Sequence, residues 1–163
     1  MHCETDVPTQ VVYCKDDRRK GDYSRIQFDF LGYSFRPRVV RLNQPTRVFG
    51  SFNPAVSKAS SKAMRAYVRR SGIRNRSNLS LGDIAQGFNP VLRGWLQYYG
   101  RYRRSEMYPV LRHFNLTLVA WAMAKFKRFR RCKTLASRWL MEVSKRDPGL
   151  FAHWQAGMVG SFI

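Results

Sequence analysis

The hydrophobic pattern of the chain changes its period once, near Phe52. Before this point apolar residues such as Ile26, Phe28 and Phe30 alternate with polar ones, which is typical of a strand with one buried face. After it, apolar residues recur every three or four positions, the period of an amphipathic helix. The pattern predicts an α+β fold, in which a short N-terminal β-hairpin or meander (1–52) is followed by a mainly α-helical bundle (53–163).

The N-terminal part contains a short β-branched run at 11–13, which predicts a strand, and a charged turn at 15–22. The alternation that follows shifts its phase at Leu31-Gly32, which predicts a bulge or sharp bend at the glycine. Tyr33 and Phe35 then continue the strand. Asn43-Gln44-Pro45 predicts a further turn before the last strand.

Three patterns in the second part predict helix starts. Asn53-Pro54 and Asn89-Pro90 each place an N-cap residue before a proline at the first helical position. The first helix would end at Ser71-Gly72, and the second would reach about Arg103. Between them, a short helix over 81–86 is predicted with Ser80 as its cap and Asp83 as a capping-box partner.

A further long helix is predicted from Leu111 onward, with Phe126 and Phe129 extending its apolar stripe. Another short helix is expected over 134–144, ended by the breaker sequence 147–149. Phe151 and Trp154 follow this breaker. We expect this aromatic tail to pack back onto the bundle.

The charge balance points to a polyanionic partner. The chain has 30 Lys and Arg against 10 Asp and Glu, a formal net charge of +20. Self-repulsion on this scale is best tolerated opposite nucleic acid, whose phosphates attract Lys and Arg. No apolar run approaches a membrane span and no signal peptide is evident, so we expect a cytoplasmic protein without a membrane partner, and an organellar location stays open as the alternative.

Basic and aromatic residues gather in three places. Residues 69–76 hold four arginines at a predicted helix end, and residues 125–131 interleave cations with two phenylalanines. Residues 95–104 interleave arginines with four aromatic rings. In this third group Trp95 and Tyr99 are expected in the core, whereas Tyr98 and Tyr102 suit either base stacking or core packing.

The sequence shows no self-contained active site. A polymerase needs paired carboxylates on neighbouring strands for its two metal ions, and the only adjacent pair, Asp16-Asp17, reads as turn chemistry. We therefore predict no catalytic residue, no metal site and no cofactor. The three cysteines are widely spaced and are expected to be free thiols.

Three stretches together resemble a known family: 89–102, 28–38 and 150–154. In this order they are similar to the maturase-specific region of group II intron reverse transcriptases, and the resemblance runs from about Val11 to Trp154. It implies the end of a reverse-transcriptase palm followed by a helical thumb and maturase region. Leu31, Gly32 and Tyr33 would then be the primer-grip positions, where a glycine permits close approach of a nucleic acid strand.

The resemblance implies that this region binds intron RNA, assists splicing and helps to hold template and primer in the parent RNA-directed DNA polymerase. Mg²⁺ would belong to the missing palm and to the intron RNA. The candidate RNA-binding residues are Arg36, Arg38, Arg69, Arg70, Arg74, Arg76, Arg93, Tyr98, Arg101, Tyr102, Arg103, Arg104, Lys125, Lys127, Arg128, Arg130 and Arg131.

The sequence before Val11 does not look like a palm, so we expect most of the finger and palm region to be missing. The expected protein is an RNA-binding maturase fragment of a bacterium, without polymerase activity of its own. Two alternatives stay open. The chain could complete a polymerase together with a separate finger-palm chain, which an exposed apolar patch near residues 11–36 would favour. It could also be a basic protein that binds RNA without a specific target.

Overall fold

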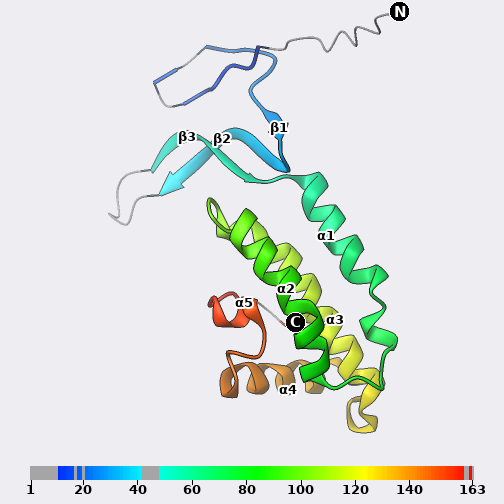
Figure 1. Cartoon of the computed structure of the whole chain (residues 1–163). Helices are drawn as coiled ribbons and strands as arrows, with labels where there is room; N and C mark the ends of the chain where they lie inside the picture. The colour runs from blue at the N-terminus through cyan, green and yellow to red at the C-terminus, as the bar shows by residue number, and fades with distance from the viewer. Residues whose placement is uncertain (1–10, 17, 20, 42–47, 160–161, 163) are drawn as a thin grey trace, which may run out of the picture. The chain divides into compact units, whose positions relative to one another are not determined.

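The computed structural model describes residues 11–16, 18–19, 21–41, 48–159 and 162. It divides into two compact units, residues 1–54 and 55–163. The first unit contains a three-stranded sheet and the second contains the helices, so the predicted α+β class is confirmed. Each unit is described by itself below (Figure 1).

The sheet has the strand order β1-β2-β3, formed by Phe28–Phe30, Tyr33–Arg41 and Val48–Val56. β1 and β2 are antiparallel, with Phe28 opposite Phe35 and Phe30 opposite Tyr33. Leu31 and Gly32 connect them with φ of 47° and 80°. Two positive φ angles are what a two-residue type I′ loop requires, so the predicted bend at this glycine is confirmed.

Two predictions in the first unit are wrong or untested. Residues 11–13 do not form a strand. The Tyr13 amide donates to the Arg25 carbonyl at 3.0 Å and the Tyr13 ring stacks on Tyr23 at 4.0 Å, so side-chain stacking holds this segment in place of a strand ladder. The predicted turn at 43–45 lies outside the described residues.

The predicted helix start at Asn53-Pro54 is wrong, because both residues belong to β3. The Asn53 carbonyl accepts from Arg38 of β2 at 3.3 Å, and proline is tolerated because β3 is an edge strand. Helix α1 instead spans Lys58–Arg70, with the Ser57 hydroxyl as its cap. It ends as predicted at Ser71-Gly72, where Gly72 has φ of 65°.

Helix α2 spans Leu81–Tyr99 without a break. The predicted cap is confirmed, since the Ser80 hydroxyl accepts from the Asp83 amide and the Asp83 carboxylate accepts from the Ser80 amide. The predicted second start at Asn89-Pro90 is wrong, and Pro90 lies inside the helix. The helix ends at Tyr99 and not at Arg103.

Helix α3, Tyr108–Lys125, is buried on most of its sides and forms the centre of the second unit. The aromatic rings of Phe88 in α2 and Phe114 in α3 meet at 5.3 Å, and Tyr67 of α1 contacts both Phe88 and Trp95. Figure 1 shows α1, α2 and α3 along one another with alternating directions. The last turns of α1 and α3 and the first turn of α2 therefore lie at one end.

The C-terminal part closes this core as predicted. Helix α4 spans Lys133–Arg146 and packs against α3, and the short helix α5 spans Ala152–Gln155. Phe151 and Trp154 are buried, and so is Phe162. Short 3₁₀ turns, η1 (Ile73–Asn75), η2 (Arg104–Met107) and η3 (Lys127–Phe129), connect the helices. Within the described part, none of the helices is both long and apolar enough to span a bilayer.

Candidate nucleic-acid interface

Two arginine-rich segments that lie about fifty positions apart in the sequence meet at one end of the helical unit. The Trp121 indole donates to the Arg76 carbonyl at 3.1 Å. The Lys125 ammonium donates to the carbonyls of Ser77 and Leu79 at 2.9 and 2.8 Å. These bonds fasten the end of α3 to the loop after η1. We call this surface the basic end; its cations are Arg69, Arg70, Arg74, Arg76, Lys125, Lys127, Arg128, Arg130 and Arg131.

Most cations of the basic end are exposed, but two have structural contacts. Lys125 is half-buried and its ammonium lies 5.7 Å from the Trp121 ring. The Arg128 guanidinium lies 4.5 Å over the Phe129 ring, which is itself buried. The phenylalanines of this segment thus belong to the core, as predicted, although Phe126 and Phe129 follow the end of α3.

The basic end holds little compensating negative charge. From Met107 to Met141 the sequence contains eight Lys and Arg and no acid. Asp83 lies close enough for Lys125 to act on it, and hydrogen bonds from Ser80 are the main cause that holds the pKa of Asp83 below its ordinary value. Its carboxylate caps α2. The guanidinium groups are therefore available to phosphates.

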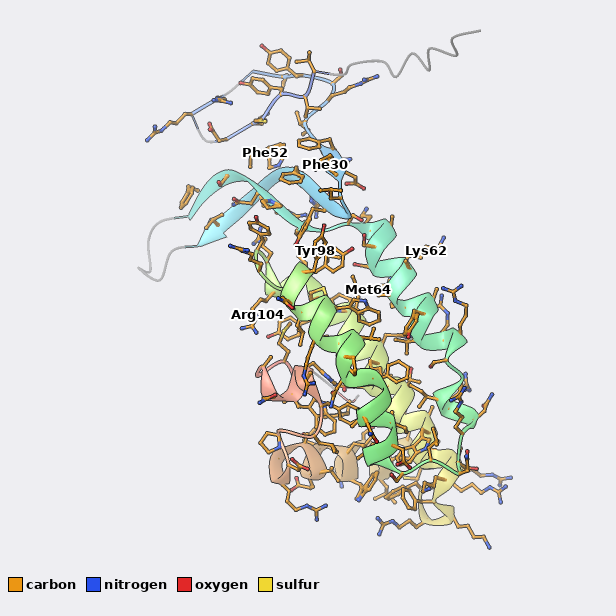
Figure 2. All side chains as sticks on the ribbon, in the orientation of Figure 1. Phe30, Phe52, Lys62, Met64, Tyr98 and Arg104 are labelled. Atoms are coloured by element: carbon orange, nitrogen blue, oxygen red, sulfur yellow. The ribbon has the colours of Figure 1, made fainter. Side chains whose placement is uncertain are left out.

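The third predicted cluster lies at the opposite end of α2, a helix of 19 residues that is about 28 Å long. Tyr98 and Tyr102 are 46% and 57% exposed, whereas Trp95 and Tyr99 are half-buried against the core. Figure 2 shows Tyr98 and Arg104 near the C-terminal end of α2. We call this surface the aromatic end; it consists of Tyr98, Arg101, Tyr102, Arg103 and Arg104.

The remaining predicted cations fall elsewhere. Arg93 is exposed midway along α2. Arg36 is half-buried in β2, and Arg38 is 8% exposed with its guanidinium donating to the Ser34 and Asn53 carbonyls. Arg38 therefore braces the sheet and does not share the exposure of the other candidates.

The predicted primer-grip positions form the tip of the β1–β2 hairpin. Leu31 is 67% exposed, and Gly32 follows it in the left-handed region. Tyr33 is 8% exposed, so its ring is not presented for base stacking. The exposed part of this turn is Leu31-Gly32.

A stripe of cations along α1 escaped the sequence analysis. Lys58, Lys62, Arg65 and Arg69 are spaced by four, three and four residues, which places them on one face of the helix. This spacing is readable in the sequence. The stripe, which we call the α1 stripe, leads into the basic end at Arg69.

Asp16 is the described member of the adjacent acidic pair Asp16-Asp17. Asp16 accepts from the Arg18 and Arg19 amides at 2.9 and 3.0 Å, so it stabilises a turn, as predicted. Over the same described ranges, no three His, Cys, Asp or Glu side chains gather into a metal site. Cys14 and Cys132 are free thiols, and Cys3 lies outside the described residues.

In a comparison with known protein families, the model for the group II intron, maturase-specific domain, matches residues 61–139. This segment runs from α1 into α4 and includes the basic end and the aromatic end. It is the maturase-specific region and not the catalytic palm of a polymerase. No curated protein and no solved structure gives a significant match to the chain. Residues 61–139 thus match a group II intron maturase-specific domain, which supports the resemblance of the chain to the C-terminal part of a group II intron maturase.

Proposed function

We propose that the chain binds group II intron RNA through the α1 stripe and the basic end, and thereby stabilises the folded intron for splicing. The observation that carries this proposal is the joining of the two arginine segments by Trp121 and Lys125. A phosphodiester chain meets several guanidinium groups at once on such a surface. Each phosphate that these groups neutralise releases counterions.

The aromatic end supplies a second contact. Tyr98 and Tyr102 present exposed rings beside three arginines. Stacking of an unpaired base on such a ring contributes about 1–3 kcal/mol. RNA that reaches both ends of α2 would be held in a fixed register along the helix.

The test compares two triple variants of equal charge change. Arg70, Arg76 and Arg130 belong to the basic end, whereas Arg138, Lys145 and Arg146 are exposed on α4. Replacing the first three by Gln should lower the affinity for intron RNA by at least ~10-fold and reduce the salt slope by about 2–3. The same replacement on α4 should change affinity less than ~3-fold. Equal losses would mean that only net charge matters.

Competition with a length-matched unrelated RNA tests the specific target. Intron RNA bound at least ~10²-fold more tightly, about 2.7 kcal/mol, would establish maturase recognition by this chain. Equal binding would assign the chain to the alternative class of general basic RNA-binding proteins.

A specific observation also favours a second function, completion of a split polymerase. Phe28 stacks on Phe35 at 4.8 Å and on Phe52 at 6.1 Å, and Phe30 on the same face of β1 is 59% exposed (Figure 2). Leu31 adds further exposed apolar surface. We propose that a finger-palm polypeptide covers this face and that the Leu31-Gly32 turn approaches the primer.

Mixing the chain with a separately expressed finger-palm chain tests this second function. We expect a complex that extends a primer on an RNA template, and Phe30→Ser should weaken its assembly. Mg²⁺ would be supplied to the palm and to the intron RNA, not to this chain. A palm chain that extends primers equally well alone would contradict the proposal.

A further inference from the structure

A recess opens between the end of α1, η1 and the middle of α3. Its volume is about 310 Å³, at the lower end of the range for ligand sites. Val68, Ile73 and Ala120 contribute an apolar lining, and Val68 and Ile73 are fully buried beneath it. Arg69 and Arg74 also line the recess. It thus combines an apolar interior with two guanidinium groups.

His113 lines the same recess and carries an unusual buried nitrogen. Its Nε2 has no hydrogen-bond partner among the described atoms. A buried polar atom without a partner costs about 1–3 kcal/mol, so native structures seldom retain one without a role. A rotation about χ2, whose allowed values are broad for histidine, would turn this nitrogen toward a molecule in the recess.

The electrostatic surroundings of His113 favour its neutral form. Burial, followed by the charges of Arg69 and Arg65, lowers the pKa of this imidazole below its ordinary value. A neutral imidazole both donates and accepts hydrogen bonds, as the edge of a nucleobase does. None of the acids of the helical unit lines the recess, so its charge suits an anion.

We propose that the recess holds one unpaired nucleotide of the bound RNA. Its base would lie over Ala120, above the buried Val68 and Ile73, and its phosphate between Arg69 and Arg74. The inference that this nucleotide belongs to an RNA strand, and is not a free nucleotide, rests on the proposed function. The position of the recess supports this inference, because Arg69 lines the recess and is also the last residue of the α1 stripe. An RNA strand that follows this stripe would bring a phosphate to the mouth of the recess. Bases outside a helix are those that proteins recognise in such pockets.

The test fills the recess without changing its charge. Ala120→Leu places a larger apolar side chain inside it, and Ala124→Leu makes the same change one turn later, at an exposed position outside it. The ligand is an RNA hairpin with a single bulged 2-aminopurine, and the same hairpin without the bulge is the control ligand. We expect Ala120→Leu to weaken binding of the bulged RNA by ~10-fold or more and to leave the unbulged RNA unaffected.

Ala124→Leu should bind both hairpins as the unmodified chain does. Equal affinities of the two variants for the bulged RNA would overturn the proposal. If Ala120→Leu proves unfolded by circular dichroism, Arg74→Gln replaces it, because Arg74 is exposed and its loss leaves the core intact. Arg74 also belongs to the basic end, so Arg74→Gln should weaken both hairpins, but the bulged one by at least ~5-fold more than the unbulged one. Equal weakening of both hairpins would overturn the proposal.

A second readout separates the recess from RNA binding as a whole. Adenosine 5′-monophosphate should shift the His113 ring resonances in NMR spectra of the unmodified chain, and the shift should disappear in Ala120→Leu. Inorganic phosphate alone should not reproduce it, and a phosphate shift of equal size would overturn the assignment to a nucleotide. If the chain binds no RNA at all, the proposed function fails. A resonance shift with the mononucleotide would then show that the recess binds a free nucleotide, which overturns the inference that its ligand is part of an RNA strand.

Discussion

Asn115 joins α3 to the C-terminal segment through one fully buried side chain. Its Oδ1 accepts from the Trp154 indole at 3.2 Å and lies 2.8 Å from the His153 Nε2, while its Nδ2 donates to the Val159 carbonyl. Because Oδ1 is an acceptor, His153 carries a proton on Nε2. Burial lowers the pKa of His153 to about 3.

Acid should therefore destabilise the helical unit well above the pKa of its carboxyl groups. The unfolded histidine binds a proton below its ordinary pKa of 6.5, whereas folded His153 does not until about pH 3. The free energy of unfolding should fall by about 2 kcal/mol between pH ~6 and ~4.5. In urea titrations, His153→Gln should weaken the dependence of the unfolding free energy on pH. The lowered pKa of His113 should leave a smaller dependence of the same sign. Parallel pH profiles for the two proteins would contradict this assignment.

Asn89 shows how a correct residue type can be assigned the wrong role. As an Asn before a proline it predicts a helix cap, yet it lies inside α2 and clamps a distant segment. Its Nδ2 donates to the Leu150 carbonyl, and its Oδ1 accepts from the Ala152 amide, both at 2.9 Å. Only the folded chain brings residues 150–152 beside it, so no local pattern reveals this contact.

Replacing Asn89 by Ala should lower the free energy of unfolding by about 1–3 kcal/mol, because two backbone groups lose their partner. Chemical denaturation measures this change. Gln86→Ala, at an exposed position one turn earlier in α2, is the control and should change stability by less than ~0.5 kcal/mol. A loss of similar size in both variants would show that the clamp contributes nothing.

At the scale of elements, α2 contains three poor helix formers on its exposed side: Gly87, Pro90 and Gly94. A Cβ added at either glycine would meet nothing within 4 Å. Gly94→Ala should therefore raise the free energy of unfolding by about 0.5–1 kcal/mol, since alanine favours the helix and no neighbour has to move. Thermal unfolding measures the change. As a contrasting variant, Gly100→Ala should destabilise, because its Cβ would lie 2.3 Å from the Leu96 carbonyl oxygen.

The sequence predicts those helix features that depend on neighbouring residues. The Ser80–Asp83 capping box and the stop at Ser71-Gly72 are both present, because each needs only a few consecutive side chains. The interruption predicted at Pro90 is absent, since side chains on both sides of it, Ile84 and Leu92, are buried in the same core. Packing over nineteen residues outweighs one missing amide.

At the scale of the whole molecule, the sequence predicts the cationic segments 69–76 and 125–131, but it does not predict that they lie side by side at the basic end. That meeting depends on Trp121 and Lys125 reaching carbonyls about 45 positions earlier. A backbone carbonyl carries no sequence signal, so these bonds follow only from the way α1 and α3 pack. The recess beside His113 escapes sequence reasoning for the same reason.

Because of the net charge of +20, the thermal stability of the chain should increase with salt concentration. Exposed ion pairs such as Lys145–Glu142 relieve little of the repulsion among the cations. Raising NaCl from about 0.05 to about 0.5 M should therefore raise the Tm, as screening weakens that repulsion. The triple Gln variant of the basic end should show a smaller rise. A Tm that falls with salt would mean that attractive pairs dominate.

The burial of Phe162 has a consequence for the order of events during synthesis. Its side chain is completely enclosed, and its carbonyl accepts from the Ser137 hydroxyl at 2.8 Å. Helices α1 to α3 emerge from the ribosome first, but the core that holds them lacks Phe151, Trp154 and Phe162 until the segment up to residue 162 has also emerged. The arginines of the nascent chain are thus exposed before the helical unit has folded. RNA close to the translating ribosome meets an unfolded polycation first and the folded domain only after residue 162 is free.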